Sequence, residues 1–353
     1  MEYIFDDVLE IKNGKNQKAV ENPAGQYPIY GSGGVMGYAD EYICDADTVI
    51  IGRKGSINNP IYVAEPFWNV DTAFGLSAKK EYLLPKYLFY FCKKFDFEKL
   101  NKTVTIPSLT KSDLLKIKID LPDKEEQQTV IDKLSKIESI ITHRKQELTV
   151  LDDLIKARFV ELFGTPFGNE KGFPMLTVDD VIEFTGGAQP DKKYFEYEPT
   201  EDNIRLIQIR DYKTDNYITY IPKSMAKRFC DADDIMIGRY GPPIFQILKG
   251  IEGSYNVALM KATPKMGNKE FIRYFLKQEC LFNFLDGLSQ RTAGQSGIEM
   301  PALKAYPFPY PPIELQEEFE QFAKQVDKSK VAVQRALDKT QLLFDSLMQE
   351  YFG

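Results

Sequence analysis

The sequence predicts an α+β protein with an internal pseudo-twofold repeat. Two similar globular domains are joined and spaced by two long helices, which we expect to pair as an antiparallel coiled coil. Two observations lead to this fold class. The segment "CDADTVIIGRKG" (44–55) returns as "CDADDIMIGRYG" (230–241). Each copy of the repeat also ends in a long stretch whose apolar residues alternate by four and three.

The duplication extends along the chain in a constant order. "DDVLEIKNG" (6–14) matches "DDVIEFTGG" (179–187), and "YFCKK" (90–94) matches "YFLKQ" (274–278). "TIPSL" (105–109) is paired with "EMPAL" (299–303), and "LPDKEEQQ" (121–128) with "PPIELQEE" (311–318). The offset between copies grows along the chain, so the second copy is longer near its start. This pattern indicates one segment doubled rather than a solenoid of many repeats.

The domain boundaries follow from the repeat. We expect a first globular domain over residues 1–122, a central spacer helix over 123–164, a second globular domain over 165–312 and a C-terminal spacer helix over 313–353. Both globular parts contain short β-like runs, such as "TVIIGR" and "IRLIQI", which are broken by turn residues. A short helix is expected within "PKYLFYFCKKFDFEKL" (85–100).

The two long stretches are predicted to be helices with a heptad seam. Pro122 and Pro312 stand just before them, where the fixed φ of proline is tolerated. A half-apolar helix of this length is unstable alone, so each is the expected partner of the other. The predicted seam of the first helix is Val130, Leu134, Ile137, Ile141, Arg144, Leu148, Leu151, Ile155, Arg158 and Leu162. That of the second is Val326, Lys330, Val333, Leu337, Thr340, Phe344, Leu347 and Tyr351.

Composition excludes several classes of protein. No apolar run reaches the ~18 residues that a membrane span needs. The first residues are acidic where a signal peptide is basic, so we expect a cytoplasmic protein. Cys44, Cys92, Cys230 and Cys280 lie far apart without a CxxC pair, which favours reduced thiols over disulfides or a zinc site. The net charge of −7 argues against indiscriminate nucleic-acid binding but allows a local basic face.

No catalytic constellation is found. His143 is the only histidine and lies within a predicted solvated helix, so neither a multi-histidine metal site nor a Ser-His-Asp triad is expected. "YGSGGVMGY" (30–38) and "IGRKGS" (51–56) lack the context of a nucleotide-binding loop. "GPPIF" (241–245) and "YPPIE" (310–314) lack the first residue of an amino-methyltransferase loop. We interpret the repeated "CDAD" acids as turn or cap residues.

Recognition is the function that the repeat favours. Arg53 and Arg239 each follow the same buried strand-like run, next to glycines that let a partner approach the backbone. Arginine suits both the O6/N7 edge of guanine and phosphate. In the first copy the predicted DNA-binding residues are Ser32, Tyr38, Arg53, Lys54, Ser56, Asn58, Lys102 and Thr103. In the second copy they are Gln208, Arg210, Arg239, Tyr240, Gln246, Arg291 and Gln295.

The chain resembles the specificity subunits of type I restriction–modification systems over its whole length. "YPIYGSGGVMGYADEY", "IGRKGS" and "FWNVDTAF" look like a first target-recognition domain. "IGRYGPP", "GSYNVALMKATP" and "PPIELQEEF" look like a second. The family's Glu-Gln pair near the helix start matches Glu126-Gln127, and it reads as swapped in Gln316-Glu317.

The resemblance implies a subunit without catalysis or cofactor of its own. Each globular part would read one half of a bipartite, asymmetric target in double-stranded DNA. The helices would fix the spacer and hold two methyltransferase subunits, which bring S-adenosylmethionine and the base-flipping chemistry. A restriction subunit is a further partner that the sequence leaves open.

Two other functions remain as alternatives. One is a coiled-coil scaffold that binds only proteins; the acidic net charge favours it, but it leaves the duplicated Gly-Arg turns unexplained. The other is a DNA-modifying enzyme complete in one chain, against which the missing methyl-donor motif argues.

Overall fold

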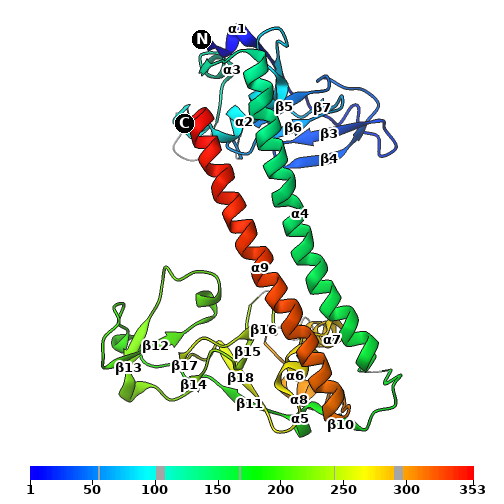
Figure 1. The fold of residues 1–353 in the computed structure, drawn as a ribbon, viewed down its shortest axis with the longest axis vertical. Coiled ribbons are helices and arrows are strands. Elements are labelled where there is room, and N and C mark those ends of the chain that lie inside the picture. Colours follow the sequence, from blue (N-terminus) through cyan, green and yellow to red (C-terminus); the bar gives the residue numbers. More distant parts are fainter. Residues whose placement is uncertain (55, 101–107, 167, 242, 290–296) are drawn as a thin grey trace. The chain divides into compact units, whose positions relative to one another are not determined.

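The computed structural model describes residues 1–54, 56–100, 108–166, 168–241, 243–289 and 297–353 (Figure 1). The chain divides into two compact units. Unit 1 comprises Met1–Glu147 and Val333–Gly353, and unit 2 comprises Leu148–Ala332. Each unit therefore contains one globular part together with a segment of each long helix.

Unit 1 contains three small sheets and short helices. Its strands are β1 (Glu2–Ile4), β2 (Leu9–Asn13), β3 (Tyr27–Gly31), β4 (Gly34–Ala39), β5 (Thr48–Gly52), β6 (Ile61–Val63), β7 (Trp68–Asn69), β8 (Ala73–Ala78) and β9 (Lys118–Asp120). Its short helices are α1 (Phe5–Val8), α2 (Pro85–Lys94), the 3-10 helix η1 (Phe97–Leu100) and α3 (Lys111–Leu114).

Unit 2 repeats this element order with additions. Its strands are β10 (Met175–Thr177), β11 (Ile182–Gly186), β12 (Asn203–Ile207), β13 (Tyr220–Pro222), β14 (Phe229–Cys230), β15 (Ile235–Gly238), β16 (Gln246–Lys249), β17 (Gly253–Tyr255), β18 (Leu259–Pro264) and β19 (Pro307–Pro309). Its helices are α5 (Val178–Val181), η2 (Lys192–Tyr194), η3 (Ile209–Tyr212), η4 (Lys223–Met225), α6 (Lys269–Leu276), α7 (Glu279–Ser289) and α8 (Met300–Lys304).

The sheets of the two units have the same topology. Strand order β2-β8-β5-β6 in unit 1 corresponds to β11-β18-β15-β16 in unit 2. Order β4-β3-β7 corresponds to β13-β12-β17, to which unit 2 adds β14. In both second sheets the β3–β7 and β12–β17 pairs are parallel. The predicted duplication and the α+β class are confirmed.

The repeated "CDAD" segment is structural, as predicted. Cys44 is fully buried, and Asp47 adopts a positive φ of 61°. The Asp47 carboxylate accepts from the Tyr62 hydroxyl at 2.6 Å and from the Lys80 ammonium at 2.8 Å. In unit 2, Asp234 accepts from the Asp231 N–H at 2.9 Å. These acids therefore fix the turns that lead into β5 and β15.

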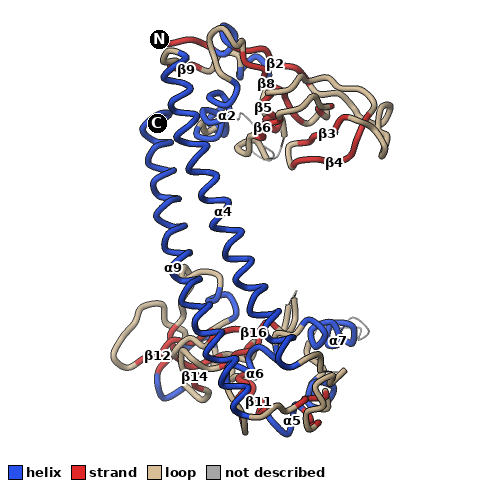
Figure 2. Tube along the Cα trace, turned by 45° about the vertical axis from the view of Figure 1, so that its right-hand side comes forward, coloured by secondary structure: helices blue, strands red, loops and turns tan. Residues whose placement is uncertain are grey.

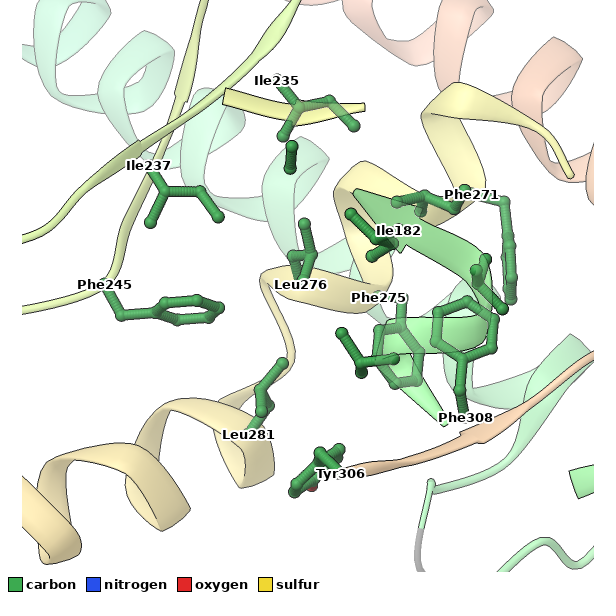
Figure 3. Packing of buried hydrophobic residues seen from close by; sticks show 14 of the residues in the cluster. Ile182, Ile235, Ile237, Phe245, Phe271, Phe275, Leu276, Leu281, Tyr306 and Phe308 are labelled. Carbon is green, nitrogen blue, oxygen red and sulfur yellow. The ribbon is translucent and has the colours of Figure 1, made fainter. Parts of the chain in front are cut away.

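Aromatic rings dominate the core of unit 2. Phe275 and Phe308 lie with ring centroids 4.1 Å apart, and Phe271 packs edge-on against Phe308 (Figure 3). The long helices contribute Phe159 and Phe319, both almost fully buried, to the same cluster. Burial of each such ring is worth ~2–3 kcal/mol. The helix segments are thus part of the unit's core.

The two long helices, α4 (Lys124–Phe163) and α9 (Ile313–Phe352), are each continuous over 40 residues (Figure 2). The residue numbers of α9 exceed those of α4 by 189 at both ends. Each predicted seam residue of α9 therefore corresponds to a predicted seam residue of α4. Every predicted seam residue is buried or half-buried. The heptad prediction is confirmed.

Within each unit the helix segments pair in antiparallel fashion. In unit 1, Lys133 donates to the Tyr351 hydroxyl at 3.2 Å, and Arg144 donates to Ala336 O and Thr340 Oγ1. Residues later in α4 therefore contact residues earlier in α9, so the two segments run antiparallel.

Unit 2 shows the same direction of pairing. Asp152 forms an ion pair with Lys330, and Arg158 forms one with Glu318 at 2.6 Å. The polar seam positions that interrupt the heptads are thus partnered across the helix pair.

One sequence interpretation is wrong at the helix starts. Gln127 and Gln316 are both fully buried, and their side-chain oxygens accept equivalent hydrogen bonds. The Oε1 atom of Gln127 accepts from the Leu84 N–H at 2.9 Å, and that of Gln316 accepts from the Asn268 N–H at 2.8 Å. The Gln-Glu pair at 316–317 is therefore not a swapped Glu-Gln pair. Gln316 replaces Gln127 directly, and Leu315 stands at the position of Glu126.

The pairing of "TIPSL" with "EMPAL" is also wrong. Thr110 caps α3 and Glu299 precedes α8, while β9 and β19 follow at the same offset of 189. "EMPAL" is the first turn of α8, with Pro301 in the position that tolerates proline. Its counterpart is therefore "TKSDL" (110–114), which shares little sequence with it.

No helix in the described ranges is both long enough and apolar enough to cross a membrane.

Candidate DNA-binding site

The turn after β5 holds the first predicted arginine. Strand β5 is buried throughout, and the two residues that follow it, Arg53 and Lys54, are exposed. The Arg53 N–H donates to Thr72 O at 2.8 Å, and Arg53 O accepts from the Leu109 N–H at 3.0 Å. Its guanidinium lies 5.8 Å from the centre of the Phe74 ring. The backbone of Arg53 is therefore fixed while its side chain reaches solvent.

The turn after β15 places Arg239 in the same way. The Arg239 N–H donates to Ala258 O at 2.9 Å, which corresponds to the bond from Arg53 to Thr72. Here the guanidinium also donates to Val257 O at 3.4 Å and lies 5.2 Å from the Tyr240 ring centre. Arg239 is half-buried and its orientation is more tightly set than that of Arg53.

A glycine before each arginine lets a second segment approach. A Cβ atom on Gly52 would lie 2.3 Å from Ser56 O and 3.0 Å from the Ser32 Cβ. A Cβ atom on Gly238 would lie 2.9 Å from Ile209 Cδ1. Backbone therefore excludes any side chain at Gly52, whereas at Gly238 the end of the Ile209 side chain would have to move. Ser32 and Ser56 are brought together at the Arg53 turn, as the sequence predicted.

The second segment is equivalent in the two units. The register of β3 on β7 and of β12 on β17 aligns Ser32 with Ile209. Gln208 and Arg210 flank Ile209, so they stand beside the Arg239 turn, where the first copy has Gly31 and Gly33. Gln246, which pairs with Gly238, adds its amide to the same place.

A third segment reaches each arginine turn from the far end of the globular part. Lys54 forms a backbone bridge with Ser108, and Tyr240 forms one with Gly297. The predicted contact residues that precede these bridges, Lys102, Thr103, Arg291 and Gln295, lie outside the described residues. The described ends of both segments nevertheless meet the turn at the residue after the arginine.

Some predicted contact residues have structural roles. The Asn58 amide donates to Asp96 Oδ1 at 3.1 Å and accepts from the Phe97 N–H at 2.8 Å, so it supports the start of η1. The Gln246 amide donates to Pro243 O at 2.9 Å. Tyr38 lies on β4, where it pairs with Pro28 and is about half exposed.

Thr219 and Asp211 belong to the site of unit 2 and were missed from the sequence. The buried Thr219 hydroxyl contacts Gln208 Nε2 at 3.1 Å and Arg210 Nη2 at 3.2 Å. Burial raises the pKa of Asp211, whose carboxylate lies within 4.0 Å of the Arg205 and Arg210 guanidinium groups. Both residues orient the candidate contacts rather than make them.

Within the ranges that the structure covers, no group of three or more His, Cys, Asp and Glu side chains could hold a metal ion. The arrangement in each unit is instead a set of exposed and half-buried hydrogen-bond donors at a turn where three segments converge. Such a set suits the recognition of base edges and phosphates.

Comparison with known families agrees with this geometry. The family model described as "Type I restriction modification DNA specificity domain" matches residues 2–150 and 170–340. The MjaVIII specificity subunit of Methanocaldococcus jannaschii is 24% identical over 325 residues, covering 81% of this chain and 74% of that protein. The MjaIX specificity subunit of the same organism is 25% identical over 169 residues, which span 41% of this chain and 37% of that protein.

Two solved structures share the fold at 15% identity. The type I restriction-modification S subunit from M. genitalium gives a TM-score of 0.64 and covers 100% of this chain and 96% of that chain. A chain from a structural study of type I complex assembly and conformational transition gives 0.54, covering 100% and 97%.

Proposed function

Because this chain belongs to the type I restriction-modification DNA specificity family, we propose that it reads a bipartite, asymmetric DNA target, one half in each unit. It directs methyltransferase subunits to that target and carries neither catalysis nor a cofactor itself. S-adenosylmethionine belongs to the partner. It works in the cytoplasm, where the DNA is.

The observation that carries this proposal is the duplicated arginine turn. In each unit, three segments converge on a glycine–arginine pair whose backbone is fixed by equivalent hydrogen bonds to Thr72 O and Ala258 O. A fixed backbone with donors that reach solvent at least in part is what base-edge readout requires, since each side chain must meet its base at a defined position. A scaffold that binds only proteins has no need of this device.

The differences between the copies support two different half-sites. Arg53 is followed by Lys54, whereas Arg239 is followed by Tyr240, whose ring it covers. Ser32 and its flanking glycines in unit 1 are replaced by Ile209 with Gln208 and Arg210 in unit 2. Two sites of one architecture but different donors read two different sequences.

The proposed division of the chain follows the repeat. Residues 1–122 and 165–312 are the two target-recognition domains, and residues 123–164 and 313–353 are the spacer helices. The helix pair sets the separation of the half-sites, which for one face of the duplex is about one helical turn.

A groove in unit 1 is the candidate surface for a methyltransferase subunit. It has a volume of about 900 Å³ and is lined by α2, α4 and α9. Phe89 and Phe344 line it together with four lysines and two acids, and Lys93 is paired with Glu138 at 2.5 Å. An amphipathic helix with an apolar face and charged edges of both signs fits this chemistry. A restriction subunit would join through the same partner complex.

The test is methylome sequencing of cells that express this chain with an active methyltransferase partner. We expect a split, asymmetric methylated motif. Arg53→Ala relaxes or abolishes recognition of one half, and Arg239→Ala does so for the other. Arg335→Ala, which removes an exposed arginine of α9, leaves both halves unchanged.

The alternatives give different outcomes. Absence of any new motif, with the partner shown to be active, supports the scaffold. Binding of labelled S-adenosylmethionine to the purified chain alone supports a single-chain modifying enzyme. Salt-dependent binding to duplex DNA without methyl-donor binding agrees with the specificity subunit.

A further inference from the structure

The two units differ most in the connection that leads away from the arginine turn. In unit 1, Ser32 and Gly33 alone join β3 to β4. In unit 2, residues 208–219, including η3, join β12 to β13. This difference accounts for most of the extra length of the second copy near its start.

The longer connection forms one wall of a polar and aromatic cup. The cup has a volume of about 470 Å³ and is lined chiefly by Tyr197, Arg210, Asp215, Asn216, Tyr217 and Tyr220. The side chains of Tyr197 and Tyr217 are 71% and 62% exposed. Two tyrosine rings that lie open to solvent beside an arginine present flat apolar faces with polar edges, which suit a partner that is partly apolar and partly polar.

The cup is held in shape by its own contacts. Arg210 Nη2 donates to Tyr217 O at 3.3 Å, and the guanidinium lies 5.7 Å from the Tyr217 ring centre. The backbones of Glu196 and Tyr220 exchange two hydrogen bonds of 2.8 and 2.9 Å, which fix the segment that bears Tyr197. A preformed surface loses little conformational entropy when it binds.

The cup is continuous with the candidate DNA site of unit 2. Gln208, Ile209 and Arg210 begin the connection, and Ile209 packs where a Cβ atom on Gly238 would stand. Arg210 therefore belongs to both places, with its guanidinium in the cup and its backbone beside the Arg239 turn.

The cup offers hydrogen-bond donors rather than free negative charge. The Asp215 carboxylate is 77% exposed but is paired with Arg205 at 3.0 Å, and the Asp211 side chain is only 1% exposed. Towards solvent the cup presents the Arg210 guanidinium, the Asn216 amide and the tyrosine hydroxyls, beside the Asp215 carboxylate whose charge Arg205 offsets. Guanidinium, amide and hydroxyl groups are the usual phosphate ligands, and tyrosine rings pack on sugars and bases.

We propose that this cup is a second DNA contact of unit 2, seated on the sugar–phosphate backbone next to the bases read at the Arg239 turn. Tyr197 and Tyr217 pack against the sugars while Arg210 and Asn216 donate to phosphate. The inference rests on the proposed function and adds to it. The half-site of unit 2 covers more DNA than that of unit 1.

The test is hydroxyl-radical footprinting and affinity measurement with the full chain bound to its methyltransferase partner. The Tyr197→Ala/Tyr217→Ala double variant is expected to bind the target roughly tenfold more weakly. It loses protection at one edge of the unit 2 half-site only. Tyr82→Ala, a half-exposed tyrosine of unit 1, is the matched control and keeps the wild-type footprint.

Asn216→Asp is the second variant, since it changes only an exposed side chain and places a carboxylate against phosphate. The DNA bound by this variant is expected to lose footprint protection at the same edge of the unit 2 half-site. A wild-type footprint and affinity for the variants would overturn the proposal. If the wild-type complex protects no specific DNA, the proposed function fails, and this inference falls with it.

Discussion

Gln127 and Gln316 make two equivalent hydrogen bonds in the two units, and Gln127 Nε2 adds a third to Tyr82 O at 2.9 Å. Each buried Oε1 accepts from the N–H of the residue before a short helix, Leu84 or Asn268. Each Nε2 donates to a proline carbonyl, Pro122 O at 3.0 Å or Pro311 O at 2.7 Å. The glutamine thus ties the start of a spacer helix to the helix that closes the sheet.

Replacing Gln127 by Leu is expected to destabilise unit 1 by ~2–4 kcal/mol, since buried backbone groups lose their partners. The free energy of unfolding, measured with urea, checks this. Glu126→Gln, at the exposed neighbouring position, serves as control and changes it by less than ~0.5 kcal/mol. A loss below 1 kcal/mol for the Leu variant would show that water replaces the amide.

Arg144→Leu is expected to leave the stability of unit 1 unchanged or to raise it by up to ~1–2 kcal/mol. Arg144 is a half-buried guanidinium on the seam, and its equivalent on α9 is the apolar Val333. An apolar side chain of similar volume therefore fits the position. Thermal unfolding measures the effect, with Lys145→Leu at the exposed neighbouring position as control. A clear fall in Tm would mean that the contacts to Ala336 O and Thr340 outweigh the desolvation.

The helices and the arginine turns could be predicted because their signals are local. Seven-residue spacing and a glycine–arginine pair are visible within a few residues. The role of Gln316 was misread because its partner, the Asn268 N–H, is 48 residues away. The letters at 316–317 suggested a swap that the hydrogen bonds contradict.

The same limit applies to the site. Asn58 was predicted to contact DNA, yet its amide is engaged by residues near position 96, which no local pattern indicates. The cup of unit 2 combines Tyr197 and Tyr217 from separate connections. Only the extra length of the second copy pointed to that region.

The thiols are expected to differ sharply in reactivity. Burial raises the pKa of Cys44 to about 12 and that of Cys230 to about 11, and it also raises the pKa of the fully buried Cys92. Cys280 is partly exposed. A thiol reagent at pH 8 should therefore modify one cysteine in the native chain and all four after denaturation. Cys280→Ser should abolish the native reaction; reaction of a second thiol would show that a unit opens.

Acid is expected to destabilise unit 1 through Asp47. The Lys80 ammonium, and after it the Tyr62 hydroxyl, hold the pKa of Asp47 below its ordinary value of 3.8. Because the pKa of Asp47 is lower in the folded than in the unfolded chain, its ionised carboxylate stabilises the fold at pH values above the unfolded pKa. This contribution is lost as pH falls through the pKa of Asp47 in the folded chain. Asp47→Asn should thus flatten the dependence of unfolding free energy on pH between about 5 and 2. Glu41→Gln, an exposed control, should keep the wild-type slope.

Lys54 and Arg53 are expected to differ in how they bind DNA. Lys54 is exposed at the rim of the turn and suits phosphate, which carries no sequence information. Lys54→Ala should weaken binding to all sequences and reduce the slope of log K against log salt by about 1. Arg53→Ala should instead cost ~1–3 kcal/mol and relax one base position. Titration of target and scrambled duplexes at several salt concentrations separates the two effects.

Tyr240→Lys, which gives unit 2 the Arg-Lys pair of unit 1, should steepen the slope of log K against log salt by about 1. An unchanged slope in both lysine experiments would mean that the residue after the arginine does not face the phosphates.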